Sequence, residues 1–141
     1  MDPKDVIGDS PPYALAMVVC DLVWRDPATG KCTILGTFSS ISAREFPCTH
    51  PLMSVFVTVT DGRGKTPIKL RLVDADEDND PLFEGEMDVE WADPRMIAEM
   101  IFAIQGVAFP SPGEYRFQLS SGGEPLMERR IVVLSSKPVE E

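Results

Sequence analysis

Residues 83–91 read Phe-Glu-Gly-Glu-Met-Asp-Val-Glu-Trp, and this stretch decides the fold class. Phe83, Met87, Val89 and Trp91 lie at odd-numbered positions, while all four residues at the even-numbered positions are acidic. Successive side chains of a β-strand point to opposite faces, so this period of two predicts a strand with one buried face and one wet face. We expect the four large apolar side chains to lie beneath an opposing layer.

The segment before this strand has the complementary pattern. Apolar residues at positions 68, 70 and 72 alternate with Lys69 and Arg71. If the two segments pair as an antiparallel hairpin, both cations face the acidic row, and each opposite-charge pair contributes roughly 0.2–1 kcal/mol. The sequence therefore predicts this strand pairing, with the acidic residues 74–80 at the hairpin tip.

Short β-like runs separated by turn residues continue along the chain. Turns are expected at residues 26–30, 61–64 and 122–123, because Gly, Pro and Asp favour chain reversal. We expect residues 61–64 to form a hairpin turn. Seven or eight such strands predict an all-β, antiparallel immunoglobulin-like sandwich. Residues 94–105 leave two readings open. Local signals favour a helix and the all-β context favours a strand, so we expect a strand, with one short helical turn near residues 94–98.

Length and tails indicate the domain organisation. A chain of 141 residues is expected to form one domain. We place a single β-sandwich domain at residues 12–134. Residues 1–11 and 135–141 are polar and contain proline, so they are expected to be flexible tails.

Charge and cysteine content exclude several classes of partner. Thirteen Lys and Arg against twenty-three Asp and Glu give a net charge of −10, which opposes binding to nucleic acid. No apolar run reaches the ~18–20 residues that span a bilayer, and the first residues do not resemble a secretory signal. Three cysteines cannot form a closed set of disulfides. We therefore expect an acidic, cytoplasmic protein with no nucleic-acid partner and no membrane span.

Four short motifs resemble those of a known family. They are, in chain order, Cys20-Asp21, the Asp-Pro-Ala-Thr-Gly-Lys run at 26–31, Phe46-Pro47, and the Pro-Gly-Glu-Tyr run at 112–115. Together they resemble a family of small, uncharacterised bacterial β-sandwich domains of immunoglobulin-like fold and unknown function. The resemblance implies that the tyrosine hydroxyl closes onto upstream backbone, as in immunoglobulin-like domains. It brings no known activity. The Cys–Cys bridge of true immunoglobulin domains is absent, because all three cysteines lie early in the chain.

The acidic stretch is the most suggestive site in the sequence. Asp74, Asp76, Asp78 and Asp80 are candidate calcium ligands, because calcium takes six to eight oxygen atoms and carboxylates at alternate positions can converge on one ion. An EF-hand register fails at its twelfth position, which is a glycine. A C2-like site would need a carboxylate from a second loop, for which Asp61 and Asp93 are the candidates. The alternative is a solvated hairpin tip whose like charges oppose edge-to-edge association.

Cys48 and the single histidine, His50, are candidates for a nucleophilic pair or, with Cys20 and Cys32, for zinc ligands. Neither is favoured, because no C-x-x-C motif is present and Cys20 falls in a strand expected to be buried. The glycine-containing loop at 61–66 lacks the spacing of a phosphate-binding loop, and no G-x-S-x-G motif occurs. We therefore expect no enzyme activity and no cofactor.

The expected function is a non-enzymatic protein-interaction or structural module, with a calcium-binding C2-like module as the alternative. The expected partner is another protein or a second copy of the chain, which makes a homo-oligomer one possible state. Residues 52–60 are the candidate interface, because Phe56 lies on an otherwise polar face of that strand. The competing reading of the same residues is an ordinary interior strand.

Overall fold

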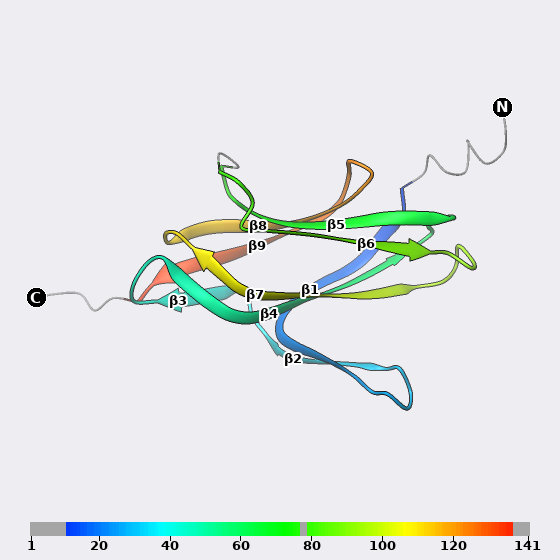
Figure 1. Cartoon of the computed structure of the whole chain (residues 1–141), viewed down its shortest axis with the longest axis horizontal. Helices are drawn as coiled ribbons and strands as arrows, with labels where there is room; N and C mark the ends of the chain where they lie inside the picture. Colours follow the sequence, from blue (N-terminus) through cyan, green and yellow to red (C-terminus); the bar gives the residue numbers. More distant parts are fainter. Residues whose placement is uncertain (1–10, 77–78, 137–141) are drawn as a thin grey trace, which may run out of the picture.

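The computed structural model describes residues 11–76 and 79–136, which fold as two β-sheets packed face to face (Figure 1). The described residues contain no helix, so none is present there that could cross a membrane. Nine strands are formed in chain order: β1 (Tyr13–Arg25), β2 (Cys32–Thr37), β3 (Ser40–Ala43), β4 (Cys48–Thr60), β5 (Lys65–Asp74), β6 (Phe83–Glu90), β7 (Ala98–Phe109), β8 (Gly113–Ser121) and β9 (Glu124–Ser135).

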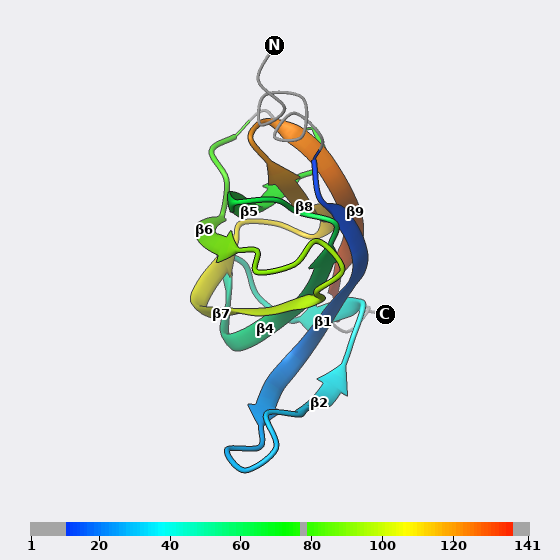
Figure 2. The same ribbon diagram turned by 90° about the vertical axis from the view of Figure 1, so that its right-hand side faces the viewer.

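One sheet has four strands in the order β2-β1-β4-β7, and the other has five in the order β3-β9-β8-β5-β6. All neighbouring strands are antiparallel except β3, which runs parallel to β9. The two layers are seen edge-on in Figures 1 and 2. The expected all-β sandwich is thereby confirmed. The sequence predicted seven or eight strands, and the short β3 is an addition that its four residues did not reveal.

The core lies between the sheets and is built by period-two alternation. On β4, Met53, Val55, Val57 and Val59 have no exposed surface. They belong to one large cluster with the inward side chains of β5 and β8. Burying such an aliphatic side chain contributes roughly 1.5–3 kcal/mol, so this alternation supplies a large share of the driving force for the fold.

The β5–β6 hairpin forms as predicted, with both cations facing the acidic row. Lys69 lies opposite Glu86 and Arg71 opposite Glu84, and the Lys69 Nζ lies 2.7 Å from a carboxylate oxygen of Glu84. Val89 is buried, whereas Phe83 and its apolar neighbours on β6 are half-buried against the core. The orientation of this strand was predicted correctly. Burial is less complete than expected because β6 is the edge strand of its sheet.

Tyr115 closes a corner onto backbone, as the resemblance implied. Its hydroxyl donates a hydrogen bond of 2.6 Å to the carbonyl oxygen of Ser111 and accepts one of 3.4 Å from the Ser111 N–H. The ring packs edge-on against Phe109, with 5.0 Å between ring centroids. The following hairpin turns at Gly122 and Gly123, which have φ angles of 56° and 87°. Positive φ angles at both central residues are typical of a two-residue hairpin turn and favour glycine.

Two local predictions need correction or refinement. Residues 61–64 do not form a hairpin turn, because β4 and β5 belong to different sheets and the loop crosses from one layer to the other. The segment with two readings forms strand β7, which confirms the strand. Residues 94–98 form no helix. The chain instead makes a turn in which the Met96 N–H donates to the Asp93 carbonyl at 3.0 Å.

The predicted tails fall largely outside the described residues, which exclude 1–10 and 137–141. Strand β9 extends to Ser135, one residue beyond the predicted end of the domain. The tails themselves stay a prediction.

Candidate functional site

The β1–β2 hairpin is the part of the fold that leaves the sandwich. Its distal half bends out of the four-stranded sheet on the side away from the five-stranded sheet (Figures 1 and 2). Within the hairpin, Gly36 has a φ of 68° and lies against the side chain of Asp21. A Cβ atom at position 36 would collide with the Asp21 carboxylate, so glycine is required both by this contact and by the backbone angle.

A second, smaller apolar cluster holds the bent hairpin in place. Val23 of the hairpin packs with Cys20 and with Phe56 of β4, and the half-buried Ile34 and Ile101 border the cluster. An ion pair of 3.9 Å between the Arg25 guanidinium and Glu99 joins the end of β1 to strand β7. In sheet order β7 is separated from β1 by β4, so the pair spans the outer face of the sheet. The hairpin is therefore packed onto this face at two points.

The opposite face of the same hairpin exposes large apolar side chains. Leu22, Trp24 and Leu35 are 45%, 51% and 47% exposed, and they are three of the eight exposed large hydrophobic residues among those described. Leu22 pairs directly with Leu35 across the two strands, and Trp24 is two residues farther along β1. Clustered apolar exposure marks a binding surface more often than single exposed residues do. We refer to Leu22, Trp24 and Leu35 as the hairpin patch.

The hairpin patch borders a sheet edge that lacks charge. Among the described strands β2 pairs with β1 alone, and its sequence Cys-Thr-Ile-Leu-Gly-Thr contains no charged residue. The edge strand β6 carries four acidic residues, and β3 has only four residues in all. Edge strands in soluble proteins are normally blunted by charge, shortness or bulges, because an open edge pairs readily with another strand. On the remaining edge strand, β7, Gly106 has a φ of 65° and interrupts the regular extended backbone.

The predicted interface at residues 52–60 is wrong. These residues lie on β4, which pairs with β1 on one side and with β7 on the other, so their backbone is not available to a partner. Phe56 is 8% exposed because the bent hairpin covers it. The competing reading, an interior strand, is correct.

The acidic loop shows only part of the geometry that a calcium site needs. Asp74 accepts a hydrogen bond of 2.6 Å from the Asn79 side chain, and its other carboxylate oxygen is buried with no partner among the described residues. Asp74 and Asp80 border a hollow of about 320 Å³. Asp76 is described and Asp78 lies outside the described residues. In the part of the chain that the structure describes, no three His, Cys, Asp or Glu side chains gather to hold an ion.

The two candidate carboxylates from a second loop are at the wrong end of the sandwich. The Asp61 N–H donates to the Pro94 carbonyl at 2.9 Å, which places Asp61 and Asp93 together near the start of β5. The acidic loop follows the other end of that strand. A ten-residue strand spans about 33 Å at ~3.3 Å per residue, so neither carboxylate reaches the loop.

Cys48 and His50 both line a hollow of about 480 Å³ that also includes Asp21. The His50 ring lies against Phe38, with centroids 5.7 Å apart. Cys20 is fully buried elsewhere, and its thiol donates to the Ser54 carbonyl at 3.5 Å. Burial, and secondly the charge of the neighbouring Asp21, raise the pKa of the Cys20 thiol, which therefore behaves as a small apolar group. The four candidate zinc ligands do not converge.

The two stacked sheets and the tyrosine corner define this chain as an immunoglobulin-like β-sandwich domain. The chain belongs to a family of unknown function (DUF6941), whose model matches residues 15–134. No curated protein matches the chain.

Three solved structures are similar to it, each with a TM-score below 0.5. An immunoglobulin-like protein from Pseudomonas aeruginosa is 13% identical with a TM-score of 0.46, and the match covers 89% of this chain and 98% of that one. A β-glucosidase from Kluyveromyces marxianus is 12% identical with a TM-score of 0.44, over 69% of this chain and 15% of that enzyme. A β-glucosidase from Listeria innocua is 12% identical with a TM-score of 0.45, over 90% of this chain and 17% of that enzyme. The chain thus spans less than a fifth of either enzyme's length, and these structures carry no argument about its activity.

Proposed function

We propose that this domain is a non-enzymatic protein-interaction module that binds through the free edge of β2 and the adjoining hairpin patch. The partner that this surface fits best is a second copy of the chain, joined by antiparallel pairing of the two β2 strands about a two-fold axis. The observation that carries the proposal is the open, uncharged edge strand beside exposed apolar residues. Main-chain hydrogen bonds would supply affinity, and apolar side chains at alternate positions would supply specificity.

The charges around β2 support self-pairing. Lys31 immediately precedes the strand, and the exposed Asp21 lies beside Gly36 near its other end. Asp26, at the same end, keeps its negative charge although it accepts a hydrogen bond of 2.9 Å from the Ala28 N–H, but Arg25, opposite Cys32, is a second cation there. A two-fold axis reverses one strand relative to the other, so the basic end of each copy approaches the acidic end of its partner. The apolar patches of the two copies then lie on the same side of the joined sheet.

The proposal includes a cytoplasmic location, which is supported by three free cysteines in a chain that needs no disulfide to close its core. Calcium binding has less support than strand pairing. One carboxylate oxygen of Asp74 in the acidic loop has no partner among the described residues, but the second set of carboxylates that calcium would need lies at the opposite end of β5.

Sedimentation velocity over a range of protein concentrations tests the proposal. We expect the unmodified chain to form dimers. Leu35→Lys should be monomeric, because Leu35 belongs both to the β2 edge strand and to the hairpin patch, and the substitution places a charge in both. Leu15→Lys is the matched control, since Leu15 is also 45% exposed but lies outside the hairpin patch. It should leave the dimer intact. A monomeric wild-type chain at the highest concentration, or equal effects of the two variants, would refute self-pairing through β2.

Ionic strength gives a second readout. The net charge of −10 makes two copies repel each other at low salt. Because the Debye length falls from about 30 Å at 0.01 M to about 8 Å at 0.15 M, added salt screens this repulsion and should strengthen a dimer held by apolar and backbone contacts. A dimer that weakens with added salt would instead be held mainly by attraction between the charged ends of the two β2 strands, and would contradict a dimer held mainly by apolar and backbone contacts.

A further inference from the structure

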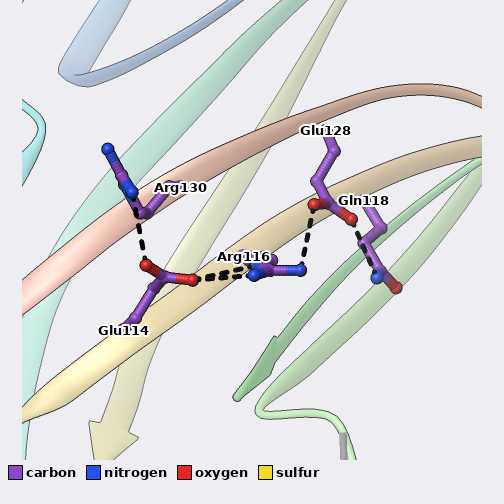
Figure 3. A network of polar contacts seen from close by, with 5 residues as sticks. All are labelled: Glu114, Arg116, Gln118, Glu128 and Arg130. Atoms are coloured by element: carbon purple, nitrogen blue, oxygen red, sulfur yellow. Dashed lines mark hydrogen bonds and ion pairs between the residues drawn. The ribbon is translucent and has the colours of Figure 1, made fainter. Parts of the chain in front are cut away.

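The outer face of β8 and β9, in the five-stranded sheet, carries a row of ion pairs. Figure 3 shows Glu114 bound by Arg116 and Arg130, and Glu128 bound by Arg116 and Gln118. Each carboxylate is shared between two donors at 2.9–3.4 Å. Such a network leaves few groups on β8 and β9 for a ligand.

Arg71, on the neighbouring strand β5, differs from these residues. Its Nε atom is buried and makes no hydrogen bond within the described ranges. The nearest carboxylate is that of Glu84, whose oxygen lies 3.9 Å from Nε, which is too long for a hydrogen bond. Glu84 is already bound by Lys69 at 2.7 Å. A guanidinium has five donors in a planar fork, and a buried donor without an acceptor costs about 1–3 kcal/mol, so this group calls for an acceptor.

A hollow of about 550 Å³ opens beside this guanidinium, within the size range of small-molecule sites. Lys69, Arg71 and Ser120 line one side of it. On the other side, formed by the start of β9, Pro125, Leu126 and Met127 supply an apolar wall. Glu128 of the same strand also lines the hollow, and its carboxylate is bound by Arg116 and Gln118.

An irregularity in β9 shapes this apolar wall. Leu119 pairs with Met127, but the next residue, Ser120, pairs with Pro125, so Leu126 is an extra residue on that strand. Such a bulge redirects side chains and is over-represented beside functional sites. The hollow therefore combines a cationic side with an apolar side.

We propose that this hollow binds a carboxylate attached to an apolar group. The carboxylate pairs with the Arg71 fork, which matches two carboxylate oxygens at once, and the Lys69 ammonium adds a second cation. The apolar part of the ligand packs against Leu126 and its neighbours. Both free small acids and the C-terminus of a peptide that ends in an apolar residue present this chemistry. The site lies on the five-stranded sheet and is independent of the β2 edge.

An NMR titration of the ¹⁵N-labelled chain with isocaproate tests the proposal, and the neutral isocaproamide serves as the probe control. We expect saturable shifts of the Ser120 and Gly123 amides and of the Arg71 Nε–H with the acid alone, with a Kd of about 1 mM, typical of a small ligand with a free energy near −4 kcal/mol. Acetate should bind at least several-fold more weakly, because it has no group to pack against the apolar wall.

Two variants locate the binding. Arg71→Met should abolish the shifts, whereas Arg130→Met, on the same face but in the ion-pair network, should leave them unchanged. Circular dichroism establishes that both variants fold. Acetyl-glycyl-leucine and its C-terminal amide distinguish the sources: tighter binding of the acid peptide than of isocaproate identifies a peptide C-terminus, and the reverse identifies a free acid. No saturable shifts, equal shifts with the neutral amide, equal binding of acetate, or retention of binding in Arg71→Met would overturn the proposal.

Discussion

Replacement of Tyr115 by Phe isolates the tyrosine corner from the packing of its ring. The change removes a hydroxyl that donates to the Ser111 carbonyl at 2.6 Å, while the ring keeps its edge-on contact with Phe109. Tyr115 is 3% exposed, but Ser111 is exposed, so the freed carbonyl can bind water. We therefore expect a loss near the lower end of the range for a hydrogen bond made by a buried group, about 1 kcal/mol of unfolding free energy.

Urea unfolding followed by tryptophan fluorescence measures this loss. For a domain of this size about 1 kcal/mol corresponds to a fall in Tm of about 3–5 °C, and the dependence on urea should keep its slope because the exposed area does not change. Tyr13→Phe is the matched control, since Tyr13 is the other of the chain's two tyrosines and is 64% exposed. It should have no measurable effect. If both variants lost the same stability, the corner would contribute nothing and the reasoning would be refuted.

Two further predictions address the hairpin cluster and the ion pair between Lys69 and Glu84. Phe56→Ala should lower the unfolding free energy by about 3 kcal/mol, because it leaves a cavity in the cluster that holds Val23. Urea unfolding measures this loss. A loss below about 1 kcal/mol would show that the hairpin does not pack against Phe56. The hydrogen bond from Lys69, and next its charge, hold the pKa of Glu84 below the ordinary 4.5. A lowered folded-state pKa gives stability above the unfolded pKa that is lost as pH falls through the folded one. The difference in urea midpoint between wild type and Glu84→Gln should therefore shrink from pH 7 to pH 3, and a constant difference would contradict this origin.

The sequence predicted those features that depend on neighbouring residues. The orientation of β6 follows from alternation over residues 83–91, and the pairing with β5 follows from two facing rows of opposite charge. The tyrosine corner and the glycine turn at 122–123 are similarly local. In each case the signal lies within a few residues, and the structure confirms it.

Features that depend on strand order could not be predicted. The loop at 61–64 has the same turn chemistry whether the chain returns within one sheet or crosses to the other, so the hairpin reading was wrong. Residues 52–60 alternate as any half-buried strand does, and nothing local says that β1 and β7 flank them. The hairpin cluster joins Val23 to Phe56, thirty-three positions apart in sequence, and depends on a bend of the β1–β2 hairpin that no local pattern predicts.

The same distinction explains why the candidate sites changed. Composition drew attention to the acidic loop, because four aspartates in seven residues form a visible cluster. The proposed surfaces are defined instead by what is missing: β2 is an edge without charges, and the buried Nε atom of Arg71 has no hydrogen-bond acceptor among the described residues. A missing charge or a missing hydrogen-bond acceptor can be recognised only when the residues that the fold places nearby are known. The acidic residues of β6 protect that edge of the five-stranded sheet from pairing with another strand, and one of them, Glu84, also pairs with Lys69. Strand β2 is an edge of the other sheet, which these acidic residues do not protect. The chain has a net charge of −10, yet the β2 edge carries no charge. Charges elsewhere on the surface therefore do not protect this edge from pairing with another strand.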